Sequence, residues 1–130
     1  MGYNFSVRIA ATFDEAVNKT VEALKIEGFG VITEIDMQQK LKEKLNVDFK
    51  KYKILGACNP PLAYEALQAE EKIGIMLPCN VLVIEQEQGI TEVAAVNPIA
   101  SMQAVVNPAL AGTAELVTVK LKKVIDLLRG

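Results

Sequence analysis

Residues 3–10 alternate between apolar and polar side chains, and this period of two predicts a β-strand with one buried face. Thr12 and Glu15 then have the spacing of a capping box, in which each side chain accepts a hydrogen bond from a free backbone N–H. Apolar residues recur every three to four positions after them, as far as Gly28. The pattern therefore predicts one strand followed by a helix that ends at Gly28.

The next part of the chain predicts two more strands with a short helix between them. Residues 29–35 and 51–58 are the strands, and Asp36 with Gln39 supplies the signal for the start of the helix. Its apolar residues recur at helical spacing and would form its inner face. They are Met37, Leu41 and Leu45.

Three Asn-Pro pairs mark the starts of further helices, at positions 59–60, 97–98 and 107–108. Asn is a favoured N-cap, and Pro suits the first helical position because it has no N–H to leave unsatisfied there. The third pair opens a long helix that runs to about Leu128. Between the first two pairs, two apolar runs flank a short turn at Gly89 and predict a β-hairpin.

This order of elements is typical of an α+β domain with a largely antiparallel sheet, two long helices on one face and short inserted helices. In the first strand of the hairpin, Val81 and Val83 point to one face while Leu82 and Ile84 point to the other. Both faces of the sheet therefore need cover. We expect the short helices or a second subunit to cover the second face, and we predict a homodimer.

Length and composition place the chain among ordinary globular proteins. Its 130 residues fit a single domain over 1–130, and 51% of them are hydrophobic. The net charge of −2 gives no reason to expect nucleic-acid binding, and no apolar run is long enough to span a membrane. Two cysteines do not make a secreted disulfide scaffold, so we expect a cytoplasmic protein.

The chain contains no histidine, which excludes Ser-His-Asp and Cys-His arrangements and any His-ligated metal. Cys58 is the best candidate for chemistry, because it ends a strand directly before a capped helix, whose dipole favours a thiolate. A free cysteine is more often simply a small buried hydrophobe. Cys79 would approach Cys58 if their strands are neighbours. We expect no metal and no cofactor, since two thiols fall short of a full ligand set.

A cluster of lysines raises the possibility of an anion site. Residues 40–53 hold six lysines and two acidic residues, a local balance of +4 in a chain whose net charge is −2. A small anion could bind there, although a solvated helix face explains the same pattern.

The segments GFGVITEID, ILGACNPPLA and LPCNV resemble the family called domain of unknown function 302, and the resemblance covers nearly the whole chain. It implies a TATA-binding-protein-like fold, of order β-α-β4-α with extra short helices, and a homodimer. The family brings no established activity, so the catalytic residues stay unknown. The positions that match its most recognisable motifs are Gly56, Cys58, Asn59, Pro60, Pro61, Pro78, Cys79 and Asn80.

Three functional hypotheses follow. The first is a small-ligand-binding or sensor domain with its pocket near the two Cys-Asn motifs. The second is a homodimeric interaction module in which these motifs are structural, and the third is a thiol-redox enzyme. The candidate ligand-binding residues of the first hypothesis are Gly56, Cys58, Asn59, Pro60, Cys79 and Asn80.

Overall fold

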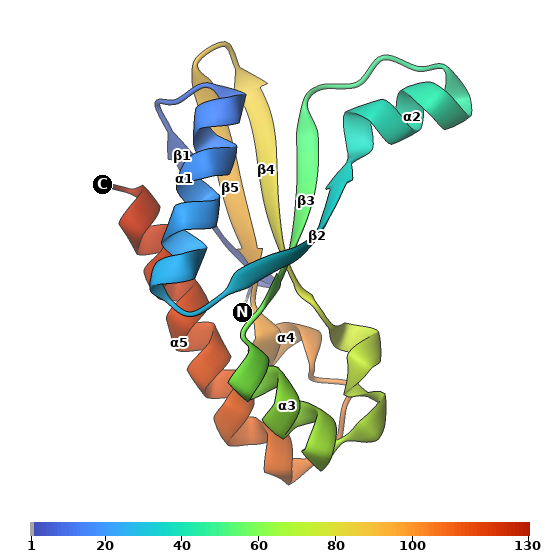
Figure 1. The fold of residues 1–130 in the computed structure, drawn as a ribbon, viewed down its shortest axis with the longest axis vertical. Helices are drawn as coiled ribbons and strands as arrows, with labels where there is room; N and C mark the ends of the chain where they lie inside the picture. The colour runs from blue at the N-terminus through green and yellow to red at the C-terminus, as the bar shows by residue number, and fades with distance from the viewer. Residues whose placement is uncertain (1) are drawn as a thin grey trace.

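The structure is a computed structural model, and it describes residues 2–130. Its elements follow the order that the sequence predicts, with two short 3-10 helices, η1 and η2, added (Figure 1). They are β1 (Asn4–Ile9), α1 (Phe13–Ile26), β2 (Gly30–Asp36), α2 (Met37–Leu45), β3 (Tyr52–Cys58), α3 (Pro60–Ala69), η1 (Glu71–Met76), β4 (Cys79–Glu87), β5 (Ile90–Val96), α4 (Pro98–Ser101), η2 (Pro108–Leu110) and α5 (Ala111–Leu128).

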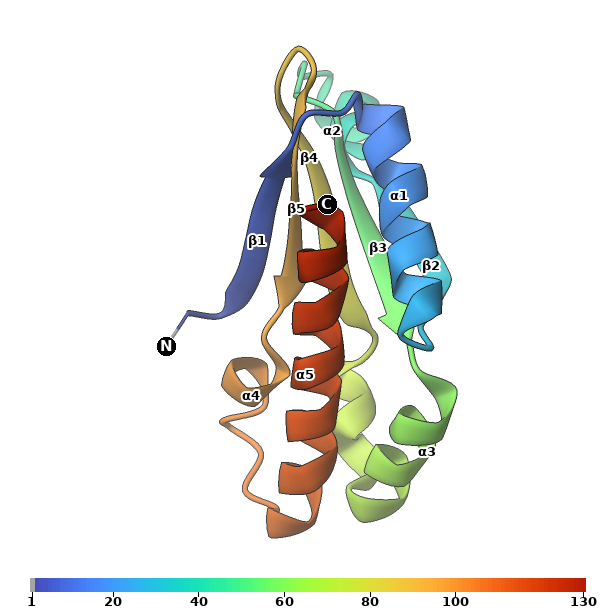
Figure 2. The same cartoon turned by 90° about the vertical axis from the view of Figure 1, so that its left-hand side faces the viewer.

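Across the described residues, five strands form one antiparallel sheet in the order β1-β5-β4-β3-β2. The long helices α1 and α5 lie side by side on one face of this sheet (Figure 2). The predicted α+β class, the antiparallel sheet and the one-sided placement of the long helices are therefore confirmed. The order of the long elements is also compatible with the β-α-β4-α pattern that the family resemblance implies.

The main core lies between the sheet and these two helices. Alternate residues of the central strands point into it and are fully buried, among them Leu55, Val81 and Val93. Leu24 of α1 and Leu121 of α5 meet them from the helix side and are also fully buried. The apolar residues recur at every second position along the strands and at every third or fourth position along the helices. Together they form a single apolar layer.

The predicted helix starts are confirmed, except that the third Asn-Pro pair opens the 3-10 helix η2, which leads into α5 at Ala111. The Thr12 hydroxyl accepts a hydrogen bond from the Glu15 N–H at 3.2 Å, and the Glu15 carboxylate accepts one from the Thr12 N–H at 2.9 Å. The hydrogen bond from the Thr12 N–H lowers the pKa of Glu15, because it stabilises the charged carboxylate. The asparagine of each Asn-Pro pair caps the helix that follows it.

Each of these three asparagines also donates its side-chain amide to a distant backbone carbonyl. Asn59 donates to the carbonyl of Glu27 at 3.5 Å, and Asn97 donates to that of Gly2 at 3.1 Å. Asn107 donates to the carbonyl of Ala69 at 2.9 Å. A side chain that both accepts and donates is needed for this double role, which explains asparagine here in place of aspartate, whose carboxylate only accepts.

Of the predicted inner face of α2, Met37 and Leu41 are half-buried and Leu45 is exposed, so the prediction of a buried face is wrong. None of the residues of this helix is buried, and Leu45 is 65% exposed. The helix lies between β2 and β3 at the tip of the molecule, on the other side of the sheet from α1 and α5 (Figures 1 and 2). Its apolar residues therefore have the right period for a helix but little of the core to pack against.

The other short helices gather at one end of the sheet, against the first half of α5 (Figure 1). There they form a second, smaller apolar cluster around Ala66, Ile73 and Leu110. The sheet face opposite α1 and α5, which we name the open face, carries a row of paired residues across four strands. This row consists of Ile35, Ile54, Leu82 and Ala94.

Candidate functional site

A cavity of about 340 Å³ lies where the ends of β3 and β4 meet α3 and α5. We name it the two-thiol cavity, because both cysteines line it. It separates the main core from the smaller apolar cluster, and side chains from both contribute to its wall. Most of the lining is aliphatic and includes Leu62, Ala66, Leu77, Leu110, Ala114 and Val117.

The polar groups of the lining are few. They come from Cys58, Asn59, Cys79 and Thr113, and the described lining contains no acidic or basic side chain. A cavity of this kind favours an uncharged molecule with apolar surface, because a charged group would be desolvated there without a partner of opposite charge.

The two cysteines come from neighbouring strands, as the sequence led us to expect if β3 and β4 were adjacent. Ala57 pairs with Cys79, so Cys58 is one position beyond the residue opposite Cys79. Cys58 is half-buried and Cys79 is buried, and both are free thiols. Burial raises the pKa of Cys79 from 9.0 to about 11, and the neighbouring Cys58 adds to the effect. Cys79 is therefore a neutral thiol at physiological pH.

The start of α3 borders the cavity but offers it few hydrogen-bond donors. Pro60 and Pro61 have no N–H, and the N–H of Leu62 donates to the Asn59 side chain at 3.4 Å. The N–H of Ala63 donates to the backbone carbonyl of Asn59 at 2.9 Å. The helix dipole remains, but the free amides that normally hold an anion at a helix start are missing from these four positions.

Of the six predicted ligand-binding residues, Cys58, Asn59 and Cys79 line the cavity. Pro60 is exposed at the first position of α3. Gly56 and Asn80 pair with each other across β3 and β4, one residue away from the pair Ala57 and Cys79. Neither Gly56 nor Asn80 is among the residues that line the cavity.

Gly56 has a clear packing role. A Cβ atom at this position would lie 2.0 Å from the Thr33 hydroxyl oxygen and 2.7 Å from Cγ of Pro78. The side chains of Thr33 on β2 and of Pro78, just before β4, therefore close over Gly56, and any larger residue would push them apart.

Several lining residues were not predicted as site residues. Leu62 and Ala66 lie on α3 and Val117 lies on α5, but nothing in the sequence marks them as walls of a cavity. Met102 lies after α4 and Leu110 ends η2, so the wall combines segments that are distant in sequence. An apolar residue beside a cavity has the same sequence signature as one in a filled core.

The lysine cluster is largely engaged in contacts with nearby residues. Lys42 lies 3.1 Å from a carboxylate oxygen of Asp48, and Lys53 lies 2.8 Å from one of Glu34. The hydrogen bond with Glu34 raises the pKa of Lys53. Two further lysines have longer polar contacts, Lys40 with Glu43 at 3.8 Å and Lys50 with Gln86 at 3.3 Å. The anion site at these lysines stays a prediction.

Two searches of the described part of the chain give negative results. Between residues 2 and 130, no group of three or more acidic, cysteine or histidine residues is placed to hold a metal ion. Over the same residues, no helix combines the length and the apolar character required to cross a membrane.

Comparison with known proteins identifies the family. The family model named Domain of unknown function DUF302 matches residues 5–128. The chain belongs to this family. A crystal structure of an uncharacterized conserved DUF302 protein from Bacillus stearothermophilus is similar to this chain. The similarity covers 99% of this chain and 100% of the Bacillus stearothermophilus chain. The two are 31% identical, with a TM-score of 0.90. A search of curated proteins finds no significant match.

Proposed function

We propose that this DUF302 chain is a small cytoplasmic binding or sensor domain whose ligand is a neutral, largely apolar molecule held in the two-thiol cavity. The observation that carries the proposal is the cavity itself. It has a volume of about 340 Å³, a mainly aliphatic wall and a few polar groups, which come from Cys58, Asn59, Cys79 and Thr113. Small-molecule sites in proteins typically have volumes of about 300–1,000 Å³ and this balance of lining groups.

An anionic ligand fits this cavity poorly. No lysine or arginine is among its described lining residues, and the first amides of α3 are either missing or already bonded. A carboxylate or phosphate would therefore be desolvated without compensation. The polar part of a ligand has Asn59, Thr113 and the two thiols as its neighbours.

Binding is also better supported than thiol-redox catalysis. Cys79 holds its proton up to a pKa of about 11, so it is a poor nucleophile near neutral pH. Ala57 is the residue paired with Cys79, and Cys58 is the next residue along β3. Because side chains alternate along a strand, the Cα–Cβ bonds of Cys58 and Cys79 leave the sheet on opposite faces. A disulfide between them would need the backbone to move. Two free thiols on neighbouring strands are in keeping with a reducing cytoplasm.

Thermal unfolding with a matched pair of probes tests the proposal. Toluene is neutral, and benzoate has a similar ring with a carboxylate. At about ten times its Kd, toluene should add about 1.4 kcal/mol to the free energy of unfolding and raise Tm, whereas benzoate should not. No rise in Tm with toluene up to its solubility limit, or an equal rise with benzoate, would contradict the proposal.

A pair of variants on the same helix locates the binding. Ala114 lines the cavity, so Ala114→Leu should fill part of it and remove most of the toluene response. Ala111 is exposed, and it lies outside the lining, so Ala111→Leu should leave the response unchanged. Equal responses in the two variants would place the bound toluene elsewhere.

A further inference from the structure

A second cavity lies beside the two-thiol cavity at the start of α5. Its volume is about 230 Å³, and we name it the α4 cavity. Figure 2 shows α3 and α4 on opposite sides of the first half of α5. The two-thiol cavity lies on the α3 side and the α4 cavity on the α4 side. The lining of the α4 cavity is mainly apolar, with Ile99, Val105 and Ala111 among its residues.

The start of α5 lies between the two cavities and lines both. Thr113 and Val117 are four positions apart on one side of the helix, and both line the two-thiol cavity. Ala111 and Glu115 have the same spacing and line the α4 cavity. Ala114 lies between these two rows and lines both cavities. The two cavities are therefore neighbours across a part of the helix that carries small side chains.

Among the described residues, Met102 and Leu110 also line both cavities. Leu110 is buried in the smaller apolar cluster, whereas Met102 is half-buried and packs against that cluster. The side chain of Met102 is unbranched and has three rotatable bonds. A change of rotamer needs no movement of the backbone. Met102 is therefore the side chain that can open one cavity to the other.

The polar groups of the α4 cavity differ in how far they are engaged. The Asn107 amide donates to the Ala69 carbonyl at 2.9 Å and to the Glu70 carboxylate at 3.1 Å. The Asn107 side-chain oxygen accepts from the Ala109 N–H at 3.0 Å. Glu115 is exposed and belongs to none of the ion pairs formed within residues 2–130. Glu115 is therefore the group with the capacity to accept a hydrogen bond from a ligand.

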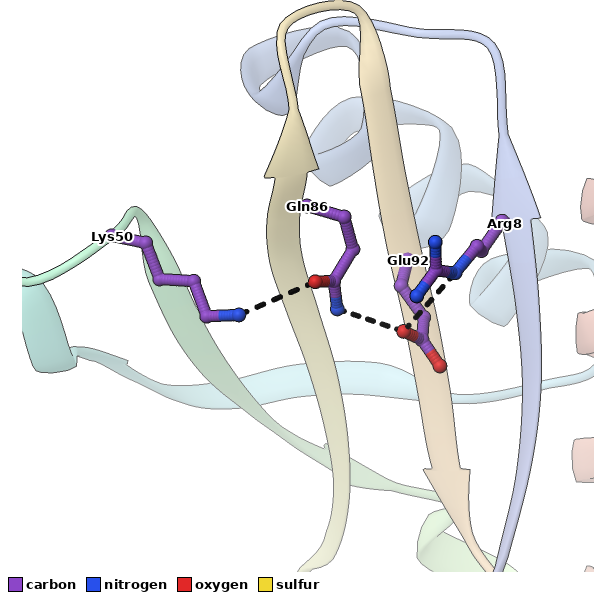
Figure 3. Close-up of polar contacts among 4 residues, drawn as sticks. All are labelled: Arg8, Lys50, Gln86 and Glu92. Atoms are coloured by element: carbon purple, nitrogen blue, oxygen red, sulfur yellow. Dashed lines mark hydrogen bonds and ion pairs between the residues drawn. The ribbon is translucent and has the colours of Figure 1, made fainter.

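Glu92 on β5 shows the contrasting case of a carboxylate whose partners lie within the molecule. The Gln86 amide donates to it at 2.8 Å, and Arg8 on β1 lies 3.7 Å away (Figure 3). Gln86 in turn accepts from Lys50 at 3.3 Å. A ligand would have to replace these contacts to reach Glu92, whereas Glu115 requires no such exchange.

We propose that the two cavities form one elongated site for a neutral single-chain amphiphile of the long-chain alcohol class. The apolar chain passes Met102 into the two-thiol cavity, and the hydroxyl group donates a hydrogen bond to Glu115. Alone, the α4 cavity is smaller than the roughly 300–1,000 Å³ of a typical small-molecule site, so it fits better as an extension of the larger cavity. Glu115 disfavours an anionic head group, because the two negative charges repel each other.

This proposal rests on the binding function proposed above and names the class of its ligand. The two can fail separately, because toluene has no long chain and needs only the two-thiol cavity. A protein that responds to toluene but binds long alcohols no better than short ones would contradict the elongated site and leave the first proposal intact.

Titration calorimetry with straight-chain alcohols from butanol to decanol tests the length of the site. Each methylene that enters an apolar cavity should tighten binding about fourfold, so the affinity should rise through the series. Ala111→Leu fills part of the α4 cavity alone. It should weaken decanol binding at least about tenfold, the loss expected when two methylenes are excluded, and leave the toluene response unchanged.

The control is Ala104→Leu, at an exposed position outside both linings, and it should bind decanol as the wild type does. The toluene response of Ala111→Leu shows that this variant is folded. If Ala111→Leu keeps that response and also keeps the wild-type affinity for decanol, the chain does not enter the α4 cavity and the proposal is overturned.

Decanoate, which has a carboxylate in place of the hydroxyl group, tests the position of the head group. The wild type should bind decanol more tightly than decanoate. Glu115→Gln removes the repulsion and should narrow this preference at least about threefold, as expected for one exposed charge pair. A Glu115→Gln protein with the full wild-type preference would overturn the placing of the hydroxyl group at Glu115.

Discussion

The side-chain amide of Asn59 donates a hydrogen bond to the backbone carbonyl of Glu27 at 3.5 Å. This contact joins the start of α3 to the end of α1, two helices that are far apart in the sequence. Gly28 allows the close approach, since its φ is +84° and a Cβ there would lie 3.1 Å from the Asn59 amide nitrogen. One wall of the two-thiol cavity is held in place by this contact, because Asn59 lines the cavity as well.

Replacing Asn59 should therefore cost more than the loss of a cap alone. Asn59→Ala removes both hydrogen bonds and should lower the free energy of unfolding by about 1–2 kcal/mol. Asn59→Asp keeps the cap but turns a carboxylate toward the Glu27 carbonyl, so it should still lose about 1 kcal/mol. Urea unfolding of the three proteins measures these differences. An Asn59→Asp protein as stable as the wild type would mean that the contact with Glu27 contributes nothing.

Gly56→Ala should be strongly destabilising for a steric reason. The new methyl group would meet Thr33 and Pro78 at distances that real contacts do not reach, so the strands must shift. We expect a loss of about 1–3 kcal/mol in urea unfolding. Gly30→Ala is the control, since its methyl group would meet nothing within 4 Å. If Gly56→Ala is close to neutral, the packing around Gly56 is looser than the structure indicates.

The stability of the protein should fall at high pH because of Cys79. Its pKa is raised from 9.0 to about 11, mainly by burial. Below pH 9 the thiol is protonated in both states, and between the two values only the unfolded chain loses the proton. The contribution of Cys79 is therefore complete below about pH 9 and falls by about 1.4 kcal/mol per pH unit up to about pH 11.

The measurement is the difference in free energy of unfolding between the wild type and Cys79→Ala, followed from pH 8 to pH 11. Other groups that titrate in this range cancel in the difference, because both proteins contain them. A difference that stays constant with pH would show that Cys79 is not buried as a neutral thiol.

The two thiols should react at different rates in the native protein. Cys58 is half-buried at the cavity wall and should react with uncharged N-ethylmaleimide, whereas buried Cys79 should react only on unfolding. Mass spectrometry of the digested protein separates the two sites. Toluene should slow the reaction of Cys58 if both occupy the same cavity. Equal rates at Cys58 and Cys79 would contradict the burial of Cys79.

Much of the fold could be predicted because its signals are local. The alternation of residues 3–10, the capping box at Thr12 and Glu15 and the three Asn-Pro pairs each determine structure within a few residues. The short helix α2 shows the limit of such signals. Its apolar spacing correctly predicts a helix, but whether Leu45 is buried depends on where β2 and β3 carry the helix. That placement is a property of the whole sheet.

The site was predicted in part for the same reason. Cys58 and Cys79 could be brought together once their strands were taken to be neighbours. Gly56 and Asn80 belong to the same motifs and pair with each other next to Ala57 and Cys79, yet neither of them lines the cavity. Leu110 and Val117 join the cavity wall through tertiary packing, which no local pattern in this chain records.

The central claim is that the two-thiol cavity is an apolar binding site, and a crystal of the protein under xenon pressure tests it most directly. Xenon enters dry apolar cavities and is located by its strong scattering. We predict a xenon atom inside the cavity, bordered by Cys58, Leu62 and Val117, and loss of that atom in Ala114→Leu. A cavity filled by ordered water, or one that excludes xenon in the wild type, would contradict the account.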